Sequence, residues 1–351
     1  MNKIDKALQM LEKNKPADAY KLLTSVKNKT SEVKFLTAES LRCSGDFIKA
    51  VGQYESALRR CADNYLTTEI LIGLASCLRT LGETKRALEV ILKAKKIITK
   101  FKFSDLKQDV ELELAMILRA SGKLDASLKL LDKLYVTYKK QKNIPGLGFI
   151  SWARGGIYRL QGKFECGIAE FKKSVEIARK LKDKATLGYA YFGLAGIMRI
   201  SGDVYLSEKY YRLAGGIFKN SQDLFAKAYA FCGLANALRQ KGDYDNAYKL
   251  YLQADKLYSQ INDKPDLGFV KWGIGTILQK QGKLKNALNY FNQAEKLFKG
   301  YDEKRGLYLS QFSKSQVLYL LGQVKKADAL FDKTYTSAKK EGLYTYLENF
   351  T

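Results

Sequence analysis

The sequence predicts an all-α protein in which about nine antiparallel helix pairs stack into a solenoid. The first observation is a glycine that recurs after one step of 37 residues and then at steps of 40, at Gly45, Gly82, Gly122, Gly162, Gly202, Gly242, Gly282 and Gly322. A fixed period of this size is the signature of stacked repeats. The second observation is that 351 residues contain only 3 prolines and show no strand-like alternation of apolar residues, which favours helices.

The first helix pair is expected at Asn2–Asn14 and Ala17–Lys27, where Asn14 takes the place of the turn glycine. All three prolines fall where a helix is expected to begin or end, at Pro16, Pro145 and Pro265. The prolines therefore agree with the helix boundaries that the repeat predicts.

Each turn glycine is followed by a second helix with a fixed order of side-chain sizes. Five residues on, alanine is common, at Ala19 (after Asn14), Ala50, Ala87, Ala247, Ala287 and Ala327. Nine residues on stands a large apolar residue, at Tyr54, Ile91, Leu131, Phe171, Tyr211, Tyr251, Phe291 and Phe331. Twelve residues on, the side chain is usually small, at Ala57, Ala94, Ser174, Ala214, Ala254 and Ala294. Because small residues let helices approach and large ones fill the gap beside them, we expect these positions to form the core.

These elements divide the chain into three parts. We expect an atypical hairpin over residues 1–29, eight helix pairs over residues 30–340, and a terminal cap or tail over residues 341–351. An end piece is needed because the last pair of a stack would otherwise leave its apolar face uncovered. We expect no second domain, long linker or low-complexity tail.

Two units carry a recognisable pattern. The unit that turns at Gly242 has the pattern residues Phe231, Leu234, Ala235, Leu238, Ala247 and Tyr251. The next unit matches at Ile274, Gly275, Leu278, Ala287 and Phe291. This pattern resembles the tetratricopeptide repeat in its form of about 40 residues, similar to that of bacterial peptide-sensing regulators and animal spindle-orientation adaptors. The resemblance covers nearly the whole chain and implies a right-handed superhelix.

The same resemblance implies that the first helix of each pair lines a concave groove, through residues 13, 10, 9, 6 and 3 before the turn glycine. The thirteenth-before column is acidic in early units, at Glu32, Glu69 and Asp109, and aromatic in the middle units, at Phe149, Tyr189, Tyr229 and Phe269. The tenth-before column adds Trp152, Phe192 and Trp272. We therefore expect a groove that is acidic at its mouth and aromatic in its middle.

The third-before column is arginine in six units, Arg42, Arg79, Arg119, Arg159, Arg199 and Arg239, and then changes to Gln279 and Tyr319. Residues 146–161, 186–201 and 224–241 contain no aspartate or glutamate. Because the arginine fork suits carboxylate or phosphate, we predict that Arg159, Arg199 and Arg239 contact an anionic ligand. The alternative is structural: arginines in a last helical turn can bond helix carbonyls or acids on neighbouring outer helices.

The first helices of the middle units also contain glycines, at Gly155, Gly156, Gly193, Gly196, Gly233, Gly273 and Gly275. Each costs roughly 0.5–1 kcal/mol relative to alanine, so we expect something to come close to the backbone there. Packing between helices explains Gly155 and Gly275 as well as a ligand does, whereas we favour a ligand at the others. The predicted ligand-binding residues are Phe149, Trp152, Gly156, Arg159, Tyr189, Phe192, Gly196, Arg199, Tyr229, Asn236, Arg239, Phe269 and Trp272.

The residue inventory argues against catalysis and metal binding. The chain has no histidine, and its 5 cysteines never form a C-x-x-C spacing. No nucleophile elbow or phosphate-binding loop is present, so we expect neither enzyme activity nor a cofactor. The start lacks the apolar core of a secretory signal, and no run approaches the ~18–20 apolar residues of a membrane span. Scattered cysteines in an odd number suggest small buried thiols in a reducing compartment, and hence a cytoplasmic protein.

The formal net charge of +25 favours acidic partners. We predict a non-catalytic scaffold whose groove binds an acidic or aromatic peptide segment of a partner protein. One alternative is nucleic-acid binding, through phosphate neutralisation and base stacking. Another is capture of a small anionic metabolite by a sensor. The sequence leaves the oligomeric state open.

Overall fold

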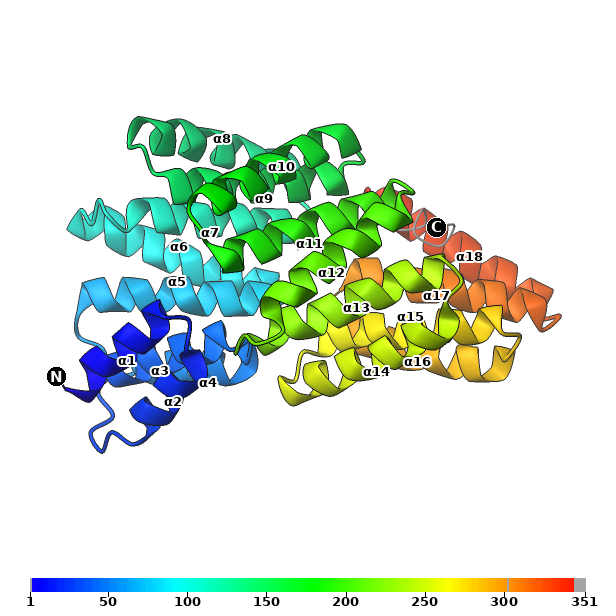
Figure 1. Cartoon of the computed structure of the whole chain (residues 1–351), viewed down its shortest axis with the longest axis horizontal. Helices are drawn as coiled ribbons and strands as arrows, with labels where there is room; N and C mark the ends of the chain where they lie inside the picture. The colour runs from blue at the N-terminus through cyan, green and yellow to red at the C-terminus, as the bar shows by residue number, and fades with distance from the viewer. Residues whose placement is uncertain (1, 302, 344–351) are drawn as a thin grey trace.

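The computed structural model describes residues 2–301 and 303–343, and within these residues every regular element is a helix (Figure 1). The first helices of the pairs are α1 (Lys3–Glu12), α3 (Ser31–Cys43), α5 (Asn64–Thr80), α7 (Lys107–Ala120), α9 (Ile144–Leu160), α11 (Lys184–Ile200), α13 (Leu224–Gln240), α15 (Lys264–Lys280) and α17 (Lys304–Leu320). The second helices are α2 (Pro16–Thr24), α4 (Phe47–Leu58), α6 (Thr84–Phe101), α8 (Leu124–Lys140), α10 (Phe164–Lys180), α12 (Val204–Phe218), α14 (Tyr244–Gln260), α16 (Leu284–Gly300) and α18 (Val324–Lys340). The predicted all-α solenoid of helix pairs is confirmed. Of the expected terminal cap or tail, residues 344–351 lie outside the described part.

The turn inside each pair requires a left-handed residue. All eight recurring glycines have φ between +72° and +96°, a region in which a side chain would be strained. At Gly162, the Lys163 N–H donates to the Tyr158 carbonyl at 2.9 Å and so caps the end of α9. Asn14 has φ of 53°, so it replaces the turn glycine as predicted.

The connections between pairs carry a second periodic feature. A left-handed residue recurs with φ of 54° to 57°, at Lys102, Lys142, Lys182 and Asn262. The position that would continue this series between the last two is occupied by Gln222, and there the regularity breaks. Helix α12 ends early, at Phe218, and residues 219–223 form a longer connection to α13. This irregular connection is where the chain meets its own N-terminal part.

The solenoid curves until its N-terminal helices, α2–α4, lie beside the α12–α13 connection (Figure 1). The Ala17 N–H at the start of α2 donates to Gln222 Oε1 at 2.9 Å. The rings of Phe47 and Phe225 meet edge to face with their centroids 5.6 Å apart. These contacts join residues about half the chain apart, so the first and middle repeats come together across the curve of the solenoid.

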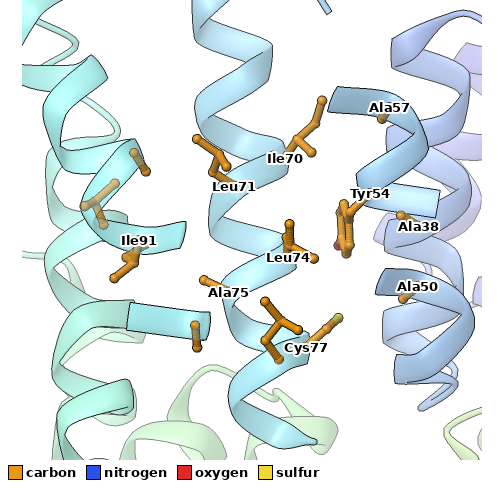
Figure 2. Packing of buried hydrophobic residues seen from close by; sticks show 14 of the residues in the cluster. Ala38, Ala50, Tyr54, Ala57, Ile70, Leu71, Leu74, Ala75, Cys77 and Ile91 are labelled. Atoms are coloured by element: carbon orange, nitrogen blue, oxygen red, sulfur yellow. The ribbon is translucent and has the colours of Figure 1, made fainter. Parts of the chain in front are cut away.

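Between neighbouring pairs, the large residue of a second helix fits a small residue on the next first helix. Tyr54 of α4 points toward α5, where it meets Leu74 and the backbone at Gly73 (Figure 2). A Cβ atom added to Gly73 would lie 2.5 Å from the Tyr54 ring. Where the large residue is Leu131 instead of an aromatic, the corresponding small residue is Ala153, in the same core cluster. The size of one side chain therefore matches the size of the other.

This packing overturns one expectation about the middle glycines. An added Cβ atom would clash with a ring of the preceding second helix, 2.2 Å from Phe171 at Gly193, 2.0 Å from Tyr211 at Gly233 and 2.3 Å from Tyr251 at Gly273. All three rings are buried. The expectation that these glycines make room for a ligand is therefore wrong, because the protein's own core fills the space.

All five cysteines are free thiols. Cys77 and Cys232 are buried as expected, whereas Cys43 and Cys166 are exposed, which corrects the expectation for those two. Within residues 2–301 and 303–343, no cluster of three or more Cys, Asp or Glu side chains could hold a metal ion. In the same part of the chain, every helix is too short or too polar to cross a membrane.

Candidate functional site: an arginine row on the first helices

The arginines of the repeat column stand in the last turns of the first helices, and acids neutralise two of them. Arg42 pairs with Glu39 of its own helix at 2.5 Å. Arg79, at the end of α5, reaches across to α7, where its Nε lies 2.6 Å from Glu113 Oε1. The structural explanation therefore holds for these two arginines, although the acids lie on first helices and not on outer helices as expected.

Arg119, at the end of α7, lies across the next first helix, α9. Its guanidinium carbon is 5.1 Å from the centroid of the Trp152 ring, and its Nη1 is 2.5 Å from where a Cβ atom on Gly156 would lie. Burial, together with the charges of Arg79 and Arg159, lowers the pKa of Arg119 to about 9. Because arginine keeps its proton in proteins, the lowered pKa means that burial, and next to it the neighbouring arginines, disfavour the charge of Arg119.

Arg159 repeats this arrangement one unit further on. Its Nη1 lies 2.7 Å from where a Cβ atom on Gly196 of α11 would stand. Its buried Nε has no hydrogen-bond partner in the part of the chain that the structure describes. Gly156 and Gly196 thus differ from the other middle glycines, because what approaches their backbone is the flexible end of an arginine from the preceding unit.

Arg199 and Arg239 are both 7% exposed. Arg239 donates from Nε to the Tyr251 hydroxyl at 3.3 Å, and its guanidinium carbon lies 5.0 Å from the centroid of the Trp272 ring. The Tyr251 hydroxyl in turn donates to Asn236 Oδ1 at 2.7 Å. Asn236 therefore positions the tyrosine that holds Arg239. The remaining buried nitrogen of Arg239, Nη2, has no hydrogen-bond partner among the described residues.

Two of the predicted aromatic anchors are committed to packing inside the protein. Phe192 is only 4% exposed, with the rings of Tyr229 and Phe218 at centroid distances of 4.9 and 5.5 Å. The expectation that Phe192 contacts a ligand is therefore wrong, since other rings of the core cover it. Tyr189 uses its hydroxyl to donate to Asp223 Oδ2 at 2.7 Å. Its hydroxyl is thus bound to the residue that caps the start of α13.

Among the predicted aromatic contacts, the exposed one lies on α9. Phe149 is 37% exposed, and its ring centroid is 5.5 Å from that of the partly buried Trp152. The guanidinium of Arg119 also lies against the Trp152 ring. Phe269, by contrast, packs on Phe298 at 4.7 Å. The structure thus brings one exposed ring, one partly buried indole and one uncompensated arginine together at the α7–α9 junction.

The acidic column gathers at the N-terminal end of the stack. Burial raises the pKa of Glu69, and the neighbouring carboxylates, Asp105 and Asp109 among them, raise it further. Burial and the charge of Asp105 likewise raise the pKa of Asp109. Such raised values arise where carboxylates crowd together or lose water. The acids of the thirteenth-before column therefore lie in the first units, and the middle units have aromatic residues at the same positions.

The sequence-based set of ligand-binding residues omits two features of this site. It leaves out Arg119, although the residues that receive its guanidinium, Trp152 and Gly156, were both predicted and could have indicated it. It also leaves out a cavity in the last repeats, which Gln279 and Tyr319 help to line. These are the two positions at which the arginine column changes to another residue type.

Two family models of the tetratricopeptide repeat match the chain, one over residues 31–131 and the other over residues 225–300. Together they cover just over half of the sequence, the first from α3 into α8 and the second over α13–α16. The chain therefore belongs to the tetratricopeptide repeat family. No curated protein sequence matches it.

Several solved structures share this fold. A Rap protein complexed with Competence and Sporulation Factor is similar at a TM-score of 0.72 and 13% identity, with 97% of each chain covered. NprR in complex with its cognate peptide NprX is similar at a TM-score of 0.58 and 20% identity, over 74% of this chain and 79% of NprR. The apo form of the quorum sensor NprR from B. thuringiensis is similar at a TM-score of 0.59 and 12% identity, with 95% of this chain and 97% of NprR covered. At these identities the likeness shows the fold alone.

Proposed function

We propose that this protein is a non-catalytic scaffold whose groove binds an acidic peptide segment of a partner protein. The observation that carries the proposal is the pair Arg119 and Arg159, neither of which forms an ion pair with a carboxylate among the described residues, although the charge of Glu113 acts on Arg119. Bonds from guanidinium to carboxylate are among the strongest polar contacts in proteins. A ligand carboxylate is therefore the group that this pair favours.

The surroundings of the pair favour a peptide over a single small anion. The exposed ring of Phe149 and the indole of Trp152 offer apolar contact beside Arg119. Arginines of the same column continue on the following first helices as far as Arg239. An extended chain that alternates carboxylates with apolar side chains would use both features over several repeats.

The similar structures agree with a ligand of this class, since NprR was solved with its cognate peptide NprX and the Rap protein with Competence and Sporulation Factor. We place the protein in the cytoplasm, where five free thiols would remain reduced. There the partner's acidic segment would be the regulatory or assembly signal that the scaffold receives.

The test is the affinity of a fluorescein-labelled peptide, Asp-Phe-Asp-Leu-Asp-Phe, measured by anisotropy. The double variant Arg119→Gln/Arg159→Gln is expected to lose affinity by about tenfold or more, because each lost charge-assisted bond weakens binding. The matched control Lys129→Gln/Lys172→Gln removes the same charge from exposed positions on α8 and α10. Equal losses in the two double variants would contradict the proposed site.

A nucleic-acid ligand is the competing outcome, because the net charge of +25 would attract any polyanion. Single-stranded oligothymidine serves as the competitor in the same assay. We expect it to displace the peptide only weakly and to lose its effect steeply with added salt. Oligothymidine that binds more tightly than the peptide at physiological salt would replace the peptide proposal with nucleic-acid binding.

A further inference from the structure

A cavity of about 600 Å³ opens between α13, α15, α17 and α18, beside Arg239, which is the last arginine of the repeat column. Its lining includes Arg239, Trp272, Gln279, Gln316, Tyr319 and Phe331. Volumes of this size are typical of sites that enclose small ligands or short peptide segments. The cavity is therefore large enough to be a binding site in its own right.

One end of the cavity carries an unsatisfied cation. Arg239 is 7% exposed, and its buried Nη2 has no hydrogen-bond partner among the described residues. Its other contacts, with Tyr251 and Trp272, hold the guanidinium in place without neutralising it. The lining adds a second cation, Lys280, and one acid, Asp328. A buried donor of this kind is stabilised when a ligand acceptor occupies it.

The lining also carries two amides, Gln279 and Gln316, which we call the amide pair. Gln279 Nε2 donates to Gln316 Oε1 at 3.3 Å. This bond uses one N–H of Gln279 and one oxygen of Gln316, so the pair keeps donors and an acceptor for other groups. A peptide group, with one N–H and one C=O, is the natural complement of such a pair.

The lining also includes large apolar side chains that are accessible. Three lining residues, which we call the apolar wall, are Tyr319, Leu320 and Phe331. They are 60%, 57% and 42% exposed. Large apolar side chains that gather on one concave surface mark a site for an apolar partner group. The cavity thus offers cationic, amide and apolar contacts in close succession.

We propose that this cavity binds a peptide segment in which a carboxylate stands next to a large apolar residue. The carboxylate bonds Arg239 Nη2, the peptide group lies on the amide pair, and the apolar side chain contacts the apolar wall. The inference rests on the proposed peptide-binding function and adds the chemistry of the bound segment. A C-terminal carboxylate and an aspartate or glutamate side chain both supply this chemistry, and the test separates them.

The measurement is the fluorescence of Trp272 in the full-length Trp152→Phe variant, because the chain has only 2 tryptophans. Three probes are titrated: acetyl-Gln-Ser-Phe-Leu as the free acid, the same tetrapeptide as its C-terminal amide, and acetyl-Gln-Asp-Phe-Leu amide. We expect the free acid to bind about tenfold or more tightly than its amide. If the aspartate peptide binds as tightly as the free acid, an aspartate side chain can also supply the carboxylate. Three probes that bind alike, or none that binds, would overturn the proposal.

Two variants locate the binding. Arg239→Gln is expected to lower the affinity of the acid about tenfold. Leu320→Glu, at an exposed position, keeps the test valid if Arg239→Gln fails to fold, and its charge should repel the carboxylate by a similar factor. Arg212→Gln, with the same charge change on an exposed arginine of α12, should bind as the parent does. A folded Leu320→Glu protein with parental affinity would refute the cavity as the site.

The two proposals can fail separately. In the Arg119→Gln/Arg159→Gln protein, the cavity inference predicts unchanged binding of the tetrapeptide acid, whereas the hexapeptide should bind about tenfold or more weakly. A hexapeptide that is indifferent to this double variant but sensitive to Leu320→Glu would contradict the middle arginine site and support the cavity. A hexapeptide that is sensitive to the double variant, together with a tetrapeptide acid that is indifferent to Leu320→Glu, would contradict the cavity alone.

Discussion

On α11, two glycines three residues apart make room for different things. Gly193 receives the ring of Phe171, whose atoms lie 2.2 Å from the position of an added Cβ. Gly196 lies under the guanidinium of Arg159, at 2.7 Å. A ring fixed in a close-packed core cannot move aside cheaply, whereas the end of an arginine side chain can. The same substitution should therefore have opposite consequences at the two sites.

Gly193→Ala is expected to lower the free energy of unfolding by about 1–3 kcal/mol, because the new methyl group overpacks the core against Phe171. Gly196→Ala should leave it unchanged or raise it by up to ~1 kcal/mol, because alanine favours the helix. Urea denaturation of both variants checks this. Equal destabilisation would show that the Arg159 side chain is held as rigidly as the ring.

The difference between these glycines could be read only in part from the sequence. Their cost to the helix is the same, so the sequence predicts a ligand at both. The distinguishing signal is the aromatic residue nine positions after the preceding turn glycine, which pairs with the glycine nine positions before the next one. Phe171 and Gly193 obey this rule, as do Tyr54 and Gly73. The approach of Arg159 to Gly196 is not readable this way, because a long side chain can take several directions.

Two carboxyl groups at the start of α15 make stability depend on pH. Burial raises the pKa of Asp263 to about 6 and that of Asp266 well above its usual range, and the charge of Asp263 adds to the latter. Since the folded state then holds protons that the unfolded state releases, these groups cost stability as pH rises from about 4 through 6 and beyond.

Asp266→Asn removes part of this cost and keeps an acceptor for the Tyr258 hydroxyl. We expect the free energy of unfolding at pH 7 to rise by about 1 kcal/mol, and its decline between pH 4 and 7 to become flatter. Asp245→Asn, at an exposed position on α14, is the control and should change neither. A less stable Asp266→Asn protein at pH 7 would contradict the sign of the shift.

At the scale of elements, the pairs share one kind of turn in different surroundings. Gly162 has φ of 72° and nothing within 4 Å of an added Cβ. Gly45 has φ of 85°, and the backbone nitrogen of Phe225 lies 2.9 Å from the added atom. The first glycine is therefore required by its turn alone, whereas the second is also required by the contact between the first and middle repeats.

Gly162→Ala is expected to cost about 1–2 kcal/mol, the strain of a left-handed side chain. Gly45→Ala should cost more, and it should also increase hydrogen exchange at the amides of residues 222–226, because the start of α13 must move away. Denaturation and amide exchange measure the two effects. Identical costs without a change in exchange would mean that the first and middle repeats do not contact each other in solution.

The helices themselves follow from local signals, namely turn glycines, prolines at helix starts and a fixed order of large and small residues. The α12–α13 connection does not. Its shape depends on Gln222 bonding the backbone of Ala17, about half the chain away, and a repeat period reports only neighbours. The second series of left-handed turns, with lysine or asparagine in place of glycine, was missed for a different reason: lysine is not a usual turn residue.

At the scale of the whole molecule, the columns of the first helices give the solenoid an electrostatic direction. The acidic units come first, then the paired Arg79, then the uncompensated Arg119 and Arg159. The sequence predicts the columns, but it does not show which arginine is neutralised. Glu113 forms its ion pair with Arg79 by reaching back from α7 to α5, so Arg119 has no direct ion pair with this acid and only its charge acts on Arg119.

The most direct test of this account combines two measurements on Arg119→Gln: the free energy of unfolding without ligand and the affinity for the acidic hexapeptide. An arginine kept for binding destabilises the empty protein. We therefore expect Arg119→Gln to have a free energy of unfolding equal to or above that of the parent and an affinity for the hexapeptide at least about tenfold lower. A loss of more than about 1 kcal/mol in stability with unchanged affinity would assign Arg119 to the structure and contradict the central claim.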